Sequence, residues 1–255
     1  MRRIEVLIHP TCLSSYRLIK KLIEKNTISR VKLVSMENLF QIINYKAWSV
    51  PWIIVDGQAA ATDPVEYPEL EAIIENRELV VRDPLEAFKN TIIHSGYLSS
   101  IVALWGSINP VLNNEVISVA IREPITKIDV EYVKERIVEK KEEIYREIID
   151  VVYRTLGIAF VRELLWASRG ELTEDDLTKY VDPLIVKTWL IAKASIGRIG
   201  LPRDPWNRGS ESAEAISNFI SRSARGILNK VRREYEEITS DEDYWRVIRE
   251  ISDQV

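Results

Sequence analysis

The sequence is short of cysteine, histidine and methionine. Its 255 residues include one cysteine, two histidines and two methionines. A single cysteine excludes a disulfide within the chain, and Cys12, His9 and His94 are too few to form a typical Cys/His zinc site. We therefore expect no metal centre, and we expect any sulfur chemistry of this chain to take place at Cys12.

Long apolar runs and excess positive charge are also lacking. No stretch approaches the roughly 20 apolar residues of a membrane-spanning helix, and the early acidic residue Glu5 is unlike a signal peptide. The net charge of −4 gives no overall attraction to nucleic acid. We expect a cytoplasmic protein with neither membrane nor nucleic-acid partners. The abundance of Ile, Glu, Lys and Arg is a balance seen in thermophile proteins.

The sequence does contain a strand-to-helix turn that carries the cysteine. Residues 4–8 alternate as in a strand, and apolar residues recur at helical spacing at Leu18, Ile19, Leu22 and Ile23. Because Pro10 and Thr11 end the strand, we expect the helix to begin at or just after Cys12. The free N–H groups and the dipole of the helix would then lower the pKa of the thiol below its free value of about 8.5. The alternative is that Cys12 is a small buried hydrophobic residue.

The first 80 residues predict alternating strands and helices. After a first helix that ends near residue 26, we expect a strand over 30–36, a helix over 37–48 and a strand over 53–55. Asp56-Gly57 is a hairpin signal, because a type I′ turn needs positive φ. It predicts a return strand over 58–62, and a helix follows over 67–76. The order is β-α-β-α-β-β-α.

This order, with a cysteine at the first helix and Val50-Pro51 before the third strand, resembles the thioredoxin superfamily, and in particular its glutaredoxin-like members. The resemblance implies that the Val50-Pro51 peptide is cis, lies beside Cys12 and pairs with an extended thiol substrate. The motif from Cys12 to Ser15 is C-x-x-S, not the C-x-x-C of dithiol enzymes. A mixed disulfide on Cys12 would therefore be released only by an external thiol. This leaves monothiol exchange, conjugation of a thiol cofactor, or no chemistry at Cys12.

Beyond residue 80 the sequence predicts helices. We expect one helix over 84–105, an irregular segment or short strand pair over 109–124, and a long helix over 129–168 with a possible break at Gly157. Thr173 and Asp176 form a capping-box pattern, and helices follow over 184–196, 210–238 and 240–251. We therefore predict an α/β thioredoxin-like domain over 1–80 and an all-α domain over 81–255. This arrangement resembles glutathione transferases, although the stretch Ala61-Thr62-Asp63-Pro64 stands where that family has a Glu-Ser pair.

Two functional hypotheses remain open. In the enzyme hypothesis, Cys12 is the nucleophile, Ser15 donates a hydrogen bond to it, and Thr11 with Val50 and Pro51 positions a thiol substrate. A low-molecular-weight thiol is then the implied cofactor. In the alternative, the chain is a non-catalytic protein-interaction or ligand-binding module and Cys12 is incidental. The resemblance and the apolar stripe over 133–164 predict a homodimer, and the arginine-bearing loop over 197–209 is either a substrate lid or a surface connection.

Overall fold

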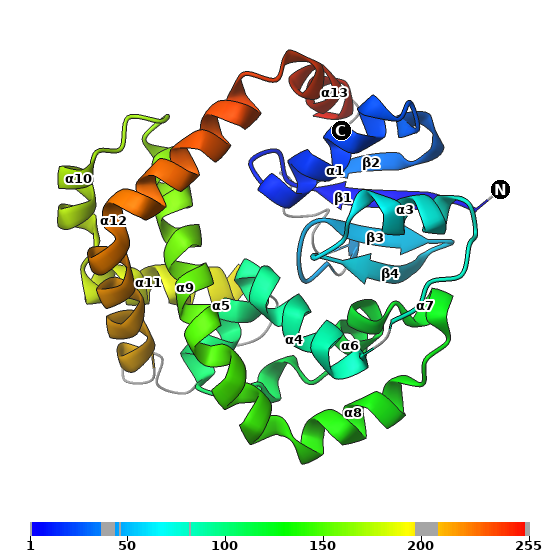
Figure 1. The fold of residues 1–255 in the computed structure, drawn as a ribbon, viewed down its shortest axis with the longest axis horizontal. Coiled ribbons are helices and arrows are strands. Elements are labelled where there is room, and N and C mark those ends of the chain that lie inside the picture. The colour runs from blue at the N-terminus through cyan, green and yellow to red at the C-terminus, as the bar shows by residue number, and fades with distance from the viewer. Residues whose placement is uncertain (1, 37–43, 46, 82, 197–208, 253–255) are drawn as a thin grey trace. The chain divides into compact units, whose positions relative to one another are not determined.

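The computed structural model describes residues 2–36, 44–45, 47–81, 83–196 and 209–252 (Figure 1). The chain forms a small mixed sheet of four strands together with many helices. It divides into two compact units. Unit 1 comprises Met1–Thr91, Asn113–Ile137 and Ile238–Val255, and unit 2 comprises Ile92–Leu112 and Val138–Glu237. These units differ from the predicted division at residue 80, because two later segments belong to the unit that holds the sheet.

The sheet of unit 1 has the strand order β2-β1-β3-β4. The strands are β1 (Ile4–Ile8), β2 (Lys32–Ser35), β3 (Trp52–Val55) and β4 (Gln58–Thr62). Strand β1 pairs in parallel with β2 and antiparallel with β3, and β3 pairs antiparallel with β4. The predicted hairpin is confirmed, and both Asp56 and Gly57 have positive φ, at +51° and +86°. Every residue of β1 and β3 is buried, as expected for the two central strands.

Helices from three parts of the sequence complete unit 1. They are α1 (Leu13–Glu24), α3 (Tyr67–Ile74), most of α4 (Pro84–His94), α6 (Asn114–Ile121), α7 (Glu123–Thr126), most of α8 (Val130–Glu139) and α13 (Glu242–Ser252), with a 3₁₀ turn at Ile28–Arg30. Helices α6 and α7 pack against β4, and α13 packs against β2 and α1. The helix predicted over 37–48 falls largely outside the described residues.

Arg122 attaches the second segment of unit 1 to the end of the sheet. Its guanidinium is buried, pairs with the carboxylate of Glu69 and donates to the carbonyl oxygen of Pro64 at 2.6 Å. A second link joins Trp48 to this segment, because its indole N–H donates to Glu115 at 2.9 Å. A buried guanidinium without partners would be costly, so these contacts explain why a segment from beyond residue 80 packs in unit 1.

Unit 2 is helical. Its helices are the end of α4, α5 (Gly96–Trp105), the end of α8, α9 (Lys141–Ala167), α10 (Glu174–Tyr180), α11 (Pro183–Ile196) and most of α12 (Ser210–Thr239), with a 3₁₀ turn at Asn109–Val111. Helix α5 packs against α9 and α11. Gly157 lies inside α9, where an added Cβ would come within 2.7 Å of the Phe219 ring of α12. Glycine therefore permits a close approach of two helices here and does not break α9.

Three predicted segments differ from the structure, and local capping explains two of them. The helix predicted over 84–105 is broken at Ser95, whose side chain accepts from the N–H of Leu98 and begins α5. The segment over 109–124 is helical from residue 114, because Asn113 caps α6 by accepting from Val116. The long helix over 129–168 is two helices that meet at Lys140.

Candidate functional site: the Cys12 turn

Cys12 is the N-cap residue of α1, as predicted. Its backbone is extended, with φ −81° and ψ 120°, and its carbonyl accepts the first helical bond from Tyr16 at 2.9 Å. The preceding turn is closed by the Cys12 N–H, which donates to the His9 carbonyl at 3.0 Å. Pro10 and Thr11 occupy the two central positions of this turn. The segment from His9 to Cys12, hereafter the Cys12 turn, therefore joins the end of β1 directly to α1.

The peptide between Val50 and Pro51 is cis, and it lies beside the cysteine. The Cys12 Sγ atom lies 3.7 Å from the carbonyl oxygen of Val50, within hydrogen-bonding distance for a thiol donor. Both parts of the prediction for this peptide are confirmed. The structure thus brings together Cys12, Val50 and Pro51 from segments 38 residues apart. What these residues bind stays a prediction.

Burial raises the pKa of the Cys12 thiol above its ordinary value, although the residue as a whole keeps some exposure to solvent. The backbone N–H and hydroxyl of Ser15 and the N–H of Ser14 favour the thiolate, and the carboxylate of Asp63 opposes it. The predicted lowering of the pKa is therefore wrong in direction. Desolvation and a nearby negative charge outweigh the helix N–H groups, because both disfavour a charged sulfur.

Ser15 is fully buried and interacts with two residues of the Cys12 turn, His9 and Cys12. Its hydroxyl oxygen accepts from the backbone N–H of His9 at 3.3 Å, and the residue also stabilises the Cys12 thiolate. Thr11, predicted to position a substrate, interacts with the His9 ring, and its hydroxyl lies 3.0 Å from Nδ1. A substrate that used the Thr11 hydroxyl would have to share it with this ring.

Asp63 is a site residue to which the sequence prediction gave no role. Its side chain is buried and accepts a hydrogen bond from the Ser14 hydroxyl at 3.1 Å. It precedes Pro64 in a second cis peptide, and the carbonyl of Pro64 is the one that Arg122 binds. In the sequence, Asp63 stands directly after the predicted return strand and next to Pro64. That position gave no indication that Asp63 would face the first helix.

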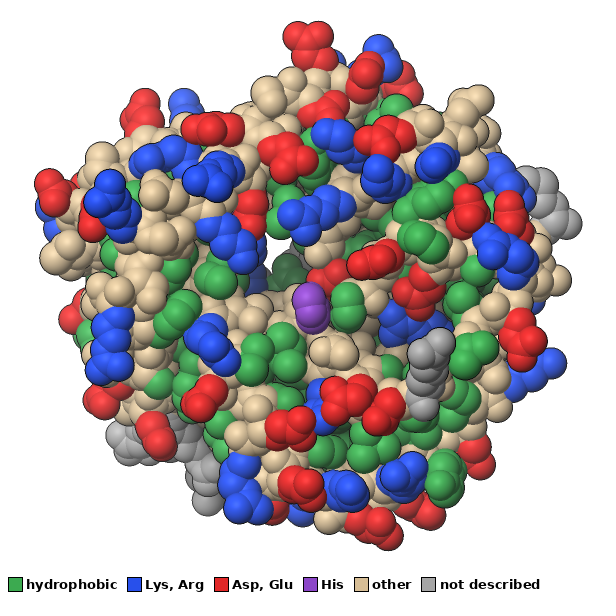
Figure 2. Space-filling view, in the orientation of Figure 1, with side chains coloured by type: hydrophobic (Ala, Val, Ile, Leu, Met, Phe, Trp, Pro, Cys, Tyr) green, Lys and Arg blue, Asp and Glu red, His purple; other side chains and the backbone are tan. Residues whose placement is uncertain are grey.

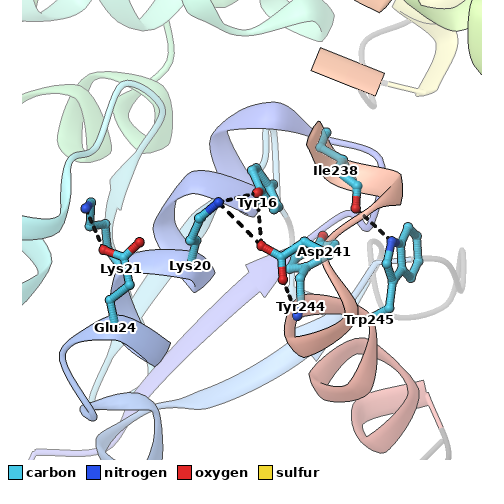
Figure 3. A network of polar contacts seen from close by, with 8 residues as sticks. All are labelled: Tyr16, Lys20, Lys21, Glu24, Ile238, Asp241, Tyr244 and Trp245. Carbon is cyan, nitrogen blue, oxygen red and sulfur yellow. Dashed lines mark hydrogen bonds and ion pairs between the residues drawn. The ribbon is translucent and has the colours of Figure 1, made fainter. Parts of the chain in front are cut away.

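Tyr244 is a second residue that the prediction missed. Its hydroxyl donates to the carbonyl of Pro10 at 2.8 Å, across 234 positions of sequence. The N–H of Tyr244 in turn donates to Asp241, whose carboxylate also accepts from Tyr16 (Figure 3). Nothing in the sequence around Tyr244 indicates a contact with the N-terminal turn, because the pairing depends on how α13 packs.

Other kinds of site find no support within the described residues. No group of His, Cys, Asp and Glu side chains in this part of the chain could hold a metal ion. On the face drawn in Figure 2, acidic and basic side chains are interspersed and neither sign forms a continuous patch. No described helix combines the length and apolar character needed to cross a bilayer. Most of the loop over 197–209 lies outside the described residues.

Comparison with known proteins identifies no relative of this chain. No protein-family model, no curated protein and no solved structure matches this chain. We therefore infer a function from the geometry around Cys12.

Proposed function

We propose that this chain is a thioredoxin-like protein of the monothiol type, in which Cys12 carries out thiol-disulfide exchange or thiol transfer. One observation carries the proposal. The sulfur of Cys12 stands at the N-terminus of a helix and 3.7 Å from the carbonyl of Val50, whose peptide with Pro51 is cis. An extended substrate that paired with the backbone at Val50 would present its own sulfur close to Cys12.

The sheet supports the proposed fold. It is a small mixed sheet of four strands that contains the predicted β3-β4 hairpin and is accompanied by helices, and this is compatible with a thioredoxin-like domain. The helices of unit 2 are in keeping with a glutathione transferase-like helical part.

The proposed chemistry has two exchange steps. The Cys12 thiolate attacks one sulfur of an external disulfide, a mixed disulfide forms at Cys12, and the other sulfur leaves as a thiolate. A second external thiolate then attacks the substrate sulfur of the mixed disulfide and releases the Cys12 thiolate. Ser15 occupies the position of a resolving cysteine and cannot perform this second step. A low-molecular-weight thiol is the class of reagent that would fit this role.

The raised pKa determines what kind of exchange is expected. A thiol with a high pKa is mostly protonated near neutral pH, so attack is slow, and its thiolate is a poor leaving group. A mixed disulfide on Cys12 should therefore persist, which suits capture or transfer of a thiol better than rapid turnover.

The same observation favours a second candidate. If the Cys12 thiol stays protonated and covered at physiological pH, the chain would act as a non-catalytic protein-interaction or ligand-binding module. The two candidates differ in one measurable property, because only the thiol-exchange protein requires the native sulfur to be reachable.

The test measures the rate of Cys12 alkylation by iodoacetamide on the native protein, from mildly acidic to strongly alkaline pH. We expect a single titration whose midpoint lies above that of a free cysteine. Asp63→Asn should lower this midpoint, because it removes a negative charge beside the sulfur. Ser15→Ala should raise it, because it removes a hydrogen bond to the thiolate.

Asp175→Asn is the matched control, because it neutralises an exposed carboxylate on α10 in the other unit. Its profile should equal that of the wild type. Should the native protein react at no pH at which it stays folded, and react only when denatured, the thiol-exchange proposal is lost and the module remains.

The predicted homodimer stays a prediction. Its sequence argument was the apolar stripe over 133–164, and seven of the stripe residues in α8 and α9 are buried within the chain: Val133, Ile137, Ile144, Ile148, Val152, Leu156 and Phe160. The stripe therefore offers little surface to a second copy.

A further inference from the structure

The first turn of α13 is tied to α1 through Asp241 (Figure 3). One carboxylate oxygen of Asp241 accepts from the N–H of Tyr244 at 3.0 Å, which caps α13. The other oxygen accepts from the Tyr16 hydroxyl at 3.0 Å and lies 3.5 Å from the Nζ of Lys20. Burial alone would raise the pKa of Asp241, but these donors outweigh it and hold the pKa below its usual range. Asp241 is therefore charged under physiological conditions and binds both helices.

Tyr244 extends this connection to the Cys12 turn. The residue is fully buried, and its ring meets the ring of Tyr16 edge to face, with the centroids 5.0 Å apart. Its hydroxyl donates to the carbonyl of Pro10 at 2.8 Å. Because Pro10 lies two residues before Cys12 in a tight turn, rotation of the Pro10-Thr11 peptide would break this bond. A hydrogen bond of this kind contributes about 1 kcal/mol, so the helix and the turn are coupled.

We propose that α13 is a positioning element for the site, and that Tyr244 is the positioning residue that holds the Cys12 turn closed and its sulfur desolvated. This inference rests on the proposed function, in which Cys12 is the reacting group. It assigns a role to a helix at the opposite end of the sequence. Loss of the Tyr244 hydroxyl lets the turn open, which exposes the sulfur to water and to reagents.

Several other bonds also restrain the turn. The Cys12 N–H bonds the His9 carbonyl, the His9 N–H bonds Ser15, and the Thr11 N–H bonds the His9 ring, while Pro10 has no N–H to donate. The Tyr244 contact adds a link from α13 to the backbone between β1 and α1. Removal of one such bond should change the population of open turns measurably.

The test compares Tyr244→Phe with Trp245→Phe. The first variant removes only the hydroxyl that reaches Pro10. The second removes a hydrogen bond from the neighbouring residue of α13, whose indole N–H donates to the Ile238 carbonyl at 2.8 Å. The Trp245 ring also meets the Tyr244 ring with the centroids 5.4 Å apart, and phenylalanine keeps an aromatic ring at this position. Asp241→Asn is a further variant, which keeps an acceptor for the Tyr244 N–H but removes the charge opposite Lys20.

Two readouts are made on each full-length protein: the pH profile of Cys12 alkylation by iodoacetamide, and the hydrogen exchange of the Cys12 amide. Tyr244→Phe should increase the alkylation rate by about 5-fold, the factor that corresponds to the net contribution of one hydrogen bond. It should also lower the midpoint of the profile, because the exposed sulfur loses its desolvation, and accelerate exchange of the Cys12 amide. Asp241→Asn should act in the same direction and less strongly.

The controls separate this inference from the proposed function. Trp245→Phe should match the wild type in both readouts. If Tyr244→Phe also matches the wild type, α13 does not position the turn. The same conclusion follows if Tyr244→Phe and Trp245→Phe accelerate exchange of the Cys12 amide equally. If native wild-type Cys12 is inert, the proposed function fails, and the amide exchange of Tyr244→Phe still decides whether α13 holds the turn.

Discussion

Helices α1 and α10 begin in different ways and are stabilised by different means. Helix α10 starts with a full capping box, in which the Thr173 hydroxyl accepts from the Asp176 N–H and the Asp176 carboxylate accepts from the Thr173 N–H. Helix α1 starts at Cys12, where no side-chain cap is formed. Yet α1 has five buried residues, Ser15, Tyr16, Leu18, Ile19 and Leu22, while α10 has only Leu177.

The difference shows that burial can replace capping. A cap contributes about 1 kcal/mol, whereas one fully buried leucine contributes about 2–5 kcal/mol when judged by its replacement with alanine. Helix α1 can therefore begin with a sulfur, because its position is fixed by the core and by α13. Helix α10 has little buried surface and depends on its local hydrogen bonds.

The largest expected effect is in the core face of α1. Leu22→Ala, at a fully buried position, should lower the free energy of unfolding by about 3 kcal/mol, because it removes packed methyl groups and leaves a cavity. Urea titration followed by circular dichroism measures it. Lys21→Ala, on the exposed side of the same helix, is the matched control and should change stability little. A small effect of Leu22→Ala would mean that burial does not hold α1 in place.

A smaller effect is expected at the cap of α10. Thr173→Ala should lower stability by about 1 kcal/mol, because the N–H of Asp176 loses its acceptor. Amide exchange within residues 174–180 should increase, while exchange in α1 stays unchanged. Thr178→Ala, at an exposed interior position of the same helix, serves as the comparison. Equal exchange in the two variants would show that α10 does not depend on its cap.

The smallest effect is expected when α1 receives an oxygen cap. Cys12→Ser should raise the free energy of unfolding by about 0.5 kcal/mol, because a serine at an N-cap accepts from the first-turn N–H groups better than a thiol does. The same substitution removes all alkylation by iodoacetamide, since Cys12 is the only cysteine. Urea titration beside the wild type checks the stability. A loss of stability would instead show that the packing of the sulfur matters more than the cap.

Local patterns were predictable from the sequence. The alternation of residues 4–8, the Asp56-Gly57 hairpin, the cap at Thr173 and the start of α1 at Cys12 each depend on residues close together in the chain, and the structure confirms them. The cis peptide before Pro51 was predicted from a family resemblance. Short-range predictions succeed because turn, cap and pairing preferences are properties of a few neighbouring residues.

The missed features depend on residues far apart. The segment over 109–124 was misjudged because its β-branched residues favour strands, yet burial against β4 and a cap at Asn113 stabilise a helix instead. The position of Arg122 in unit 1 could not be foreseen either. Its partners at Glu69 and Pro64 come from another part of the sequence.

The sequence by itself determined where the only thiol stands: at the end of a strand, at the start of a helix, and without a second cysteine to resolve a disulfide. Only the tertiary structure decided the environment of that thiol. Asp63 lies 51 residues after Cys12 in the sequence, and Tyr244 lies 232 residues after it. The packing of β4 and α13 brings Asp63 to Ser14 and Tyr244 to Pro10. Desolvation and charge depend on all atoms that surround a group in space, so the direction of the Cys12 pKa follows from packing and not from the N-terminal motif.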